Sequence, residues 1–295
     1  MPRAVKPLNC TGMFDLDRYL SERRERIERE LANRLPPPDA QPVQLGGALR
    51  HAIMAGGKRL RPILCLAAAE AAGGLADAAM PAALAVELLH GYTLVHDDLP
   101  CMDDDDERRG MPTVHVAYGE AAAVLAGDAL QALAFESLAL TREARPGILA
   151  EMVRALGCAA YGVVAGQVED VRKDREPDRD TIAYVHEHKT ADLFAAALKL
   201  GALSAGGDPR VVGNLESCGR HLGLAFQILD DLLDAPEGSC PATDSELNCL
   251  SITSPEEARR QAARHTREAI EALADCPGVV EPIRVLAERL LTRTQ

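Results

Sequence analysis

Residues 90–110 read HGYTLVHDDLPCMDDDDERRG, and they place seven acids within eleven positions (97–107) directly after an apolar run. The apolar run predicts a buried helix that ends near Asp97 and Asp98, because Pro100 cannot continue a helix. Carboxylates this close repel one another and raise each other's pKa. Divalent cations remove that cost, since Mg²⁺ takes carboxylate oxygens and shares its other positions with water and phosphates. The stretch therefore predicts a metal site at the end of a core helix.

A second acidic cluster distinguishes this site from a solvated surface turn, which is the usual interpretation of an acidic run. The segment GLAFQILDDLLDAP (223–236) places Asp230, Asp231 and Asp234 at the end of another apolar helical run. Asp230 and Asp234 are four residues apart and share a helix face, with Gln227 one turn earlier. Two core helices that each end in Asp-Asp predict two carboxylate walls that face one pocket.

Five motifs in order resemble those of the trans-isoprenyl diphosphate synthases, the head-to-tail prenyltransferases that include farnesyl and geranylgeranyl diphosphate synthases. The motifs are GGKRLRP (56–62), HDDLPCMDDDDERRG (96–110), GQVED (166–170), HKTADLF (188–194) and GLAFQILDDLLD (223–234). The resemblance covers roughly residues 15–235. It implies the isoprenoid synthase fold and the condensation of isopentenyl diphosphate with dimethylallyl or geranyl diphosphate.

The resemblance also implies a metal and an allylic-substrate site. An allylic diphosphate ionises when the departing charge is neutralised, which two or three Mg²⁺ ions between the walls can do. Arg108 and Lys189 are expected to hold this diphosphate, while Thr190 and Gln227 direct oxygen dipoles at the carbocation. The implied metal ligands are Asp97, Asp98, Asp103, Asp230, Asp231 and Asp234. The implied catalytic residues are Asp97, Asp98, Asp103, Lys189, Thr190, Gln227 and Asp230.

The acceptor, isopentenyl diphosphate, needs a cationic pocket without metal. Lys58 and Arg61 lie three residues apart, and the preceding Gly56 and Gly57 allow close backbone approach. Without the resemblance, a lone His on a helix reads as structural. The resemblance assigns the acceptor site to Lys58, Arg61, His90 and Arg109.

Product length is expected to depend on Tyr92 or Thr93. The direction of the side chains around the helix axis favours Thr93, which lies about 40° from Asp97, whereas Tyr92 lies about 140° away. Bulk favours Tyr92. Enzymes resembling this one, with an aromatic residue five positions before the motif and a four-residue spacer, usually stop at fifteen carbons. We therefore expect farnesyl diphosphate, with geranylgeranyl diphosphate as the alternative, unless Tyr92 only packs between helices.

The segment after Asp234 departs from the family pattern. No Lys or Arg occurs in residues 235–258, where the family usually has a lysine-bearing loop. Reduced activity, altered selectivity, or a weakly active regulatory subunit of a heteromeric synthase all remain open. We expect the segment to be mobile without ligand. A class I terpene cyclase is disfavoured, because His221 stands where its late metal motif (from Asn214) requires Glu.

The composition favours packed helices and excludes several partners. The 295 residues are 47% hydrophobic but 3% aromatic, without Trp, and the net charge of −13 argues against nucleic acid or anionic membranes. Eight cysteines form no CxxC pair, so we expect a reducing cytoplasm, no zinc site and no disulfide framework. No apolar run approaches the about 20 residues of a membrane span. The resemblance implies a homodimer.

Periodicity and breaker residues predict one all-α domain (15–295) of about ten helices around a deep central cavity, after a flexible N-terminus (1–14). Asp15 and Asp180 are expected to cap helices, and no strand is expected. The expected helices span residues 16–35, 44–55, 60–72, 81–98, 117–140, 148–171, 180–203, 209–234, 255–274 and 278–292.

Overall fold

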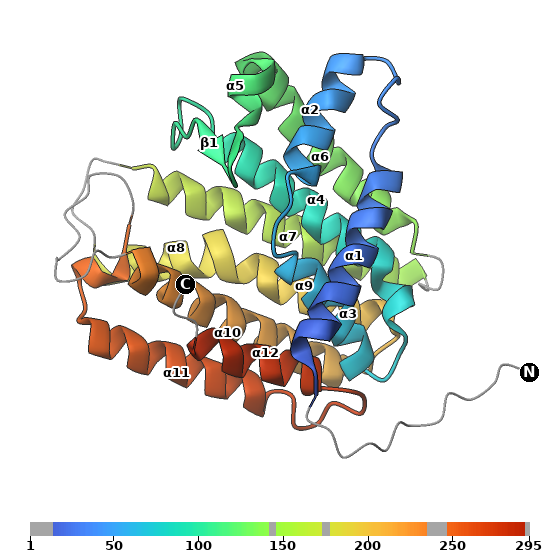
Figure 1. Cartoon of the computed structure of the whole chain (residues 1–295). Coiled ribbons are helices and arrows are strands. Elements are labelled where there is room, and N and C mark those ends of the chain that lie inside the picture. The colour runs from blue at the N-terminus through green and yellow to red at the C-terminus, as the bar shows by residue number, and fades with distance from the viewer. Residues whose placement is uncertain (1–13, 142–145, 173–177, 235–246, 293–295) are drawn as a thin grey trace, which may run out of the picture.

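The computed structural model describes residues 14–141, 146–172, 178–234 and 247–292, and most of them are helical (Figure 1). The α-helices are α1 (Leu16–Arg34), α2 (Val43–Met54), α3 (Leu60–Ala71), α4 (Met80–Asp97), α5 (Val114–Tyr118), α6 (Glu120–Ala139), α7 (Pro146–Asp170), α8 (Arg179–Val185), α9 (Asp192–Ser204), α10 (Pro209–Asp234), α11 (Pro255–Glu271) and α12 (Glu281–Leu291). The all-α prediction is confirmed. The predicted flexible N-terminus lies, up to residue 13, outside the described residues.

Helix α4 forms the centre of the bundle and packs against α3, α6 and α9. Its side chains are buried on all sides, including Leu84, Val86 and Leu88. A helix that is apolar all round needs such all-round contact. Close packing also requires a glycine, because a Cβ at Gly91 would lie 2.3 Å from Cδ1 of Ile53 on α2. The central helix thus has a fixed position from which its last residues project.

Several predicted boundaries are right and others are not. The Asp15 carboxylate caps α1 by accepting the Arg18 N–H at 3.0 Å, as predicted. The cap of α8 is Asp178 rather than Asp180, since Asp178 accepts the Thr181 N–H at 2.8 Å. The predicted helix 117–140 is divided at Gly119, whose φ of 90° ends α5 before α6 begins.

Two short elements were not predicted. Strands β1 (Glu107–Arg108) and β2 (Met111–Pro112) form an antiparallel hairpin inside the acidic motif. The predicted helix 180–203 is interrupted by a π-helical turn, η2 (His186–Ala191), between α8 and α9. Such turns inside helices frequently occur at functional sites.

The expectation concerns continuous apolar runs, and helices that include some charged residues can still have the length and mean hydropathy of a membrane span. Three segments in the described part of the chain meet those criteria, Ala76–Asp97, Glu120–Ala139 and Gly147–Asp170, with 78%, 39% and 33% of each window buried. Burial in the bundle explains the first segment. The exposed apolar faces of α6 and α7 require another explanation.

Candidate active site

The first carboxylate wall lies where α4 ends. After Asp98 the chain turns back on itself, and the Asp103 N–H donates to the Asp97 carbonyl at 2.9 Å. This turn brings the later aspartate back to the helix end, as the sequence predicts. Burial, with smaller contributions from Asp103 and Asp98, raises the pKa of Asp97 to about 7 despite the opposing charge of Lys189. The wall therefore carries a carboxyl group that ionises at a cost unless a cation is near.

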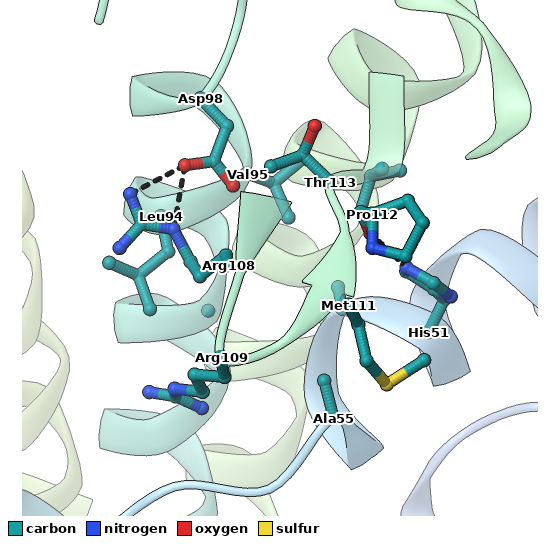
Figure 2. Close-up of a pocket in the computed structure, with 13 residues that line it drawn as sticks. His51, Ala55, Leu94, Val95, Asp98, Arg108, Arg109, Met111, Pro112 and Thr113 are labelled. Carbon is teal, nitrogen blue, oxygen red and sulfur yellow. Dashed lines mark hydrogen bonds and ion pairs between the residues drawn. The ribbon is translucent and has the colours of Figure 1, made fainter. Parts of the chain in front are cut away.

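The β1–β2 hairpin separates two neighbouring arginines. Arg108 Nε donates to Asp98 Oδ1 at 2.6 Å (Figure 2). The Arg109 guanidinium donates to the Gly56 carbonyl instead. A φ of 58° at Arg109 turns the chain between the two directions. A Cβ at Gly57 would lie 2.5 Å from the Arg109 guanidinium, so this approach requires glycine. The hairpin thus directs one arginine to the first wall and the other to the GGKRLRP turn.

The π-helical turn η2 brings Lys189 to the first wall. Its ammonium group forms an ion pair with Asp170. Burial alone would lower the pKa of Lys189, but Asp170, Asp97 and Asp103 outweigh burial and raise it. The turn packs tightly on α7, because a Cβ at Gly166 would lie 2.4 Å from the backbone nitrogen of Lys189.

The next residue of η2 contacts the second wall. The Thr190 hydroxyl donates to Gln227 Oε1 at 2.7 Å, and Gln227 Nε2 donates to Asp231 Oδ1 at 3.0 Å. Lys189 and Thr190 are adjacent in the chain, so a single turn connects the two walls. The structure brings the predicted residues together in this way, and their catalytic roles stay a prediction.

Asp231 is held by protein groups that the sequence did not reveal. Its Oδ2 accepts the Cys249 N–H at 2.8 Å and lies 3.1 Å from His186 Nε2. Burial would raise the pKa of Asp231, but His186, the Cys249 N–H and Gln227 together lower it. Both oxygens therefore already have protein partners. No spacing in the sequence signals these contacts, since Cys249 follows 18 residues later.

The segment after α10 is only partly the open loop that the sequence predicts. Residues 235–246, for which mobility is expected, lie outside the described residues. In residues 247–254, the 3-10 turn η3 (Cys249–Ser251) buries Cys249 and Leu250. The two side chains anchor this part of the segment, because they pack against residues of α8, α10 and α11.

A cationic cavity of about 570 Å³ lies beside the walls, lined by Lys58, Arg59, Arg61, Glu87, His90 and Arg109 among others. Arg61 lies over the Phe194 ring at 4.6 Å, and its Nη1 is 3.3 Å from His90 Nε2. Burial first, then Arg61, lowers the pKa of His90 well below its ordinary value. His90 is therefore neutral near pH 7 and accepts from Arg61. The four residues predicted for the acceptor site share this cavity.

The cavity contains an ion pair that the sequence motifs did not predict. Arg59, between the two predicted basic residues of GGKRLRP, is buried and donates to Glu87 Oε1 at 2.6 Å. It also adopts a left-handed conformation, with φ 49°. Glu87 lies three residues before His90 on α4, which is one helical turn. This spacing places Glu87 next to the predicted acceptor site, and it is the sequence signal that could have indicated the Arg59–Glu87 pair. Arg59 is thus already neutralised by protein.

A second, apolar cavity of about 270 Å³ begins at Asp97 and passes between α4 and α7. Both candidates for the chain-length position, Tyr92 and Thr93, line it. The Tyr92 ring makes an edge contact with His96 at 5.3 Å between centroids. The Thr93 hydroxyl donates to the His90 carbonyl at 2.8 Å, so its polar atom is satisfied within the helix. Along the cavity, Gln167 on α7 is buried, and its amide has no hydrogen-bond partner among the described residues.

Comparisons with known proteins agree with this arrangement. A family model described as Polyprenyl synthetase matches residues 42–241, more than half of the chain. A dimethylallyltranstransferase of Fischerella ambigua is 39% identical over 95% of this chain and 84% of that protein. The large subunit 2 of a heterodimeric geranylgeranyl pyrophosphate synthase of Arabidopsis thaliana is 41% identical over 78% of this chain and 62% of that protein. The structure of an FPP/GFPP synthase of Zymomonas mobilis has a TM-score of 0.85 at 37% identity and covers 94% of this chain and 98% of its own.

Proposed function

The chain belongs to the polyprenyl synthetase family, and on that premise we propose that it condenses isopentenyl diphosphate head-to-tail with dimethylallyl or geranyl diphosphate. The observation that carries this proposal is η2, whose Lys189 lies near the first wall while Thr190 connects to the second. Two acidic walls joined at one turn, next to a cationic cavity, suit a reaction between two diphosphates.

The residues of the walls fit Mg²⁺. The donor set consists of carboxylates, and the raised pKa of Asp97 shows that this group is crowded without a cation. The unpaired buried amide of Gln167 suits a water bound to such an ion. We propose that the six aspartates of the two walls hold two or three ions: Asp97, Asp98, Asp103, Asp230, Asp231 and Asp234. Bound Mg²⁺ neutralises the charge on the departing diphosphate.

The side chains around the walls position the allylic substrate. Arg108 and Lys189 exchange their aspartate partners for the diphosphate oxygens. The allylic C–O bond breaks, and its electron pair leaves with the diphosphate. Oxygen dipoles of Thr190 and Gln227 face the resulting carbocation. The tail occupies the apolar cavity below Asp97.

The cationic cavity holds the acceptor. Arg61 keeps a buried Nε without a hydrogen-bond partner among the described residues, and this N–H is available to a phosphate oxygen. Neutral His90 holds the other side of the guanidinium. The double bond of isopentenyl diphosphate forms the new C–C bond with the cation. The released diphosphate then takes the proton that the product loses.

We propose farnesyl diphosphate as the main product. Tyr92 is 92% buried at the apolar cavity, so its ring limits the length of the tail. The names of the relatives favour a second candidate, geranylgeranyl diphosphate. The test is product analysis with Mg²⁺, isopentenyl diphosphate and a series of allylic diphosphates. Tyr92→Ala should shift products toward twenty carbons or more, and an unchanged distribution would assign the limit to Thr93 or Leu89.

We propose that the protein is a homodimer in the cytoplasm. Apolar side chains remain exposed on α6 and α7, among them Leu125 at 59%, Tyr161 at 76% and Val168 at 55%. Burial of these faces against a second copy accounts for their hydropathy. The alternative is a subunit of a heteromeric synthase. Light scattering and turnover of the purified protein decide between them, because a heteromeric subunit would be monomeric or weakly active alone.

A further inference from the structure

Three potential metal ligands converge far from both carboxylate walls. His221 lies in α10, and His265 and Glu268 lie on one face of α11, which runs beside α10 (Figure 1). Nδ1 of His221 is 3.1 Å from Nδ1 of His265, and each of these atoms is 3.3 Å from the same Glu268 oxygen. The cluster belongs to neither substrate cavity described above.

Hydrogen bonding accounts poorly for this triangle. A neutral imidazole presents Nδ1 either as donor or as acceptor, and a carboxylate oxygen only accepts. If both Nδ1 atoms carry protons, both can donate to Glu268, but two N–H groups then face each other at 3.1 Å; if only one carries a proton, one of the two 3.3 Å edges to Glu268 has no donor. Two ring nitrogens and a carboxylate oxygen that lie 3.1–3.3 Å from one another are favourable when a cation lies between them.

The edges of the triangle match tetrahedral metal coordination. Zn²⁺ bonds to imidazole nitrogen and carboxylate oxygen are about 2.0–2.1 Å, which separates tetrahedral ligand atoms by about 3.3–3.4 Å. The observed edges are 3.1, 3.3 and 3.3 Å. Two imidazoles with one carboxylate are a ligand set for Zn²⁺ and similar ions, whereas Mg²⁺ prefers oxygen ligands.

We propose that His221, His265 and Glu268 bind one Zn²⁺-type ion that fastens α11 to α10. The side chains of His221 and His265 are 27% and 15% exposed, so an ion reaches the site and keeps a water as its fourth ligand. His221 precedes Asp230 by nine residues, about 13–14 Å along the helix, so the site is separate from catalysis. The ion stabilises the helix that carries the second wall.

Cysteine spacing could not reveal this site. The absence of CxxC pairs led to the expectation of no zinc site, which considers cysteine ligands alone. His221 and His265 are 44 residues apart, and only the packing of α11 on α10 brings them together.

The test is calorimetric titration of the full-length, chelator-treated protein with Zn²⁺ in excess Mg²⁺, which occupies the carboxylate walls. We expect one Zn²⁺ per chain and a melting temperature that rises with Zn²⁺. His221→Ala, His265→Ala and Glu268→Gln should each weaken Zn²⁺ binding by about tenfold or more. His51→Ala, which removes a histidine elsewhere, should bind as the wild type does.

Each outcome decides the proposal. If the wild type binds no Zn²⁺ under these conditions, or if all three variants bind it with unchanged affinity, the site does not exist. If binding is lost in Asp97→Ala but kept in His221→Ala, the ion occupies the carboxylate walls. Should an alanine variant fail to fold, Glu268→Gln, which conserves size, gives the answer. Visible absorption of bound Co²⁺, changed by His265→Ala, would confirm imidazole ligands.

Discussion

The two carboxylate walls have similar sequences, yet the structure holds them differently. In the first wall, at the end of α4, burial and like charges raise the pKa of Asp97 to about 7. The neighbouring partners there are the cationic side chains of Arg108 and Lys189. In the second wall, a histidine, an amide and a backbone N–H hold Asp231 and lower its pKa.

The two walls differ in whether their charged aspartates stabilise the fold before a cation binds. Asp231 has fixed protein partners, so its charge stabilises the fold with or without a ligand. Asp97 is buried and lies near two other carboxylates, so its charge destabilises the fold until a cation arrives. A similar Asp-Asp pattern is therefore a cation-binding site in the first wall and, at Asp231, a structural anchor in the second wall. Four predictions test this comparison.

The largest expected effect is loss of turnover when either wall is broken. Asp97→Ala and Asp230→Ala should each lower turnover roughly 10²–10⁴-fold, because charge neutralisation at the leaving group provides several kcal/mol. The measurement is incorporation of labelled isopentenyl diphosphate, with circular dichroism to confirm unchanged helicity. Wild-type turnover in either variant would refute the need for that wall.

Without metal, substitutions in the two walls should change the free energy of unfolding in opposite directions. Asp231→Ala leaves the buried Cys249 N–H unpaired and should lower the free energy of unfolding by about 1–3 kcal/mol. Asp97→Asn removes the crowded charge and should raise it by roughly 1–2 kcal/mol at pH 8. Urea denaturation with a chelator measures both. Changes of the same sign would remove the distinction between the walls.

The pH dependence of the metal-free protein should reflect Asp97. Its pKa rises from 3.8 unfolded to about 7 folded, so the folded state binds the proton more tightly. Stability from this group therefore falls as pH rises from about 4 to about 7. Asp231, whose pKa is lowered, loses its contribution only as the pH falls below 3.8. Urea midpoints at pH 5 and pH 8 should differ more in the wild type than in Asp97→Asn, and equal differences would contradict the assignment.

The smallest effect concerns the contact between η3 and the second wall. Asn248 donates to the Asp231 carbonyl at 3.2 Å and caps η3 by accepting the Leu250 N–H at 2.8 Å. Asn248→Ala should lower the free energy of unfolding by about 1 kcal/mol. It should also speed hydrogen exchange of the Cys249 amide. Exchange at the wild-type rate would show that Asp231 alone holds this turn.

The sequence by itself determined the features that depend on residues close together in the chain. The apolar run and Pro100 determine where α4 ends, and the Asp15 cap depends on a contact three residues away. The spacing of Asp230 and Asp234 defines a helix face. Local spacing translates directly into geometry in these cases, because a helix has a fixed rise and rotation per residue.

Tertiary structure alone decided which distant groups meet. The Cys249 N–H on Asp231, the Arg59–Glu87 ion pair and the pair of His221 with His265 all join separate elements. These contacts depend on how far helices approach and how they are rotated, which glycines such as Gly166 and interior packing set together. The sequence therefore named the acids of both walls, and packing decided which of them are held by protein partners.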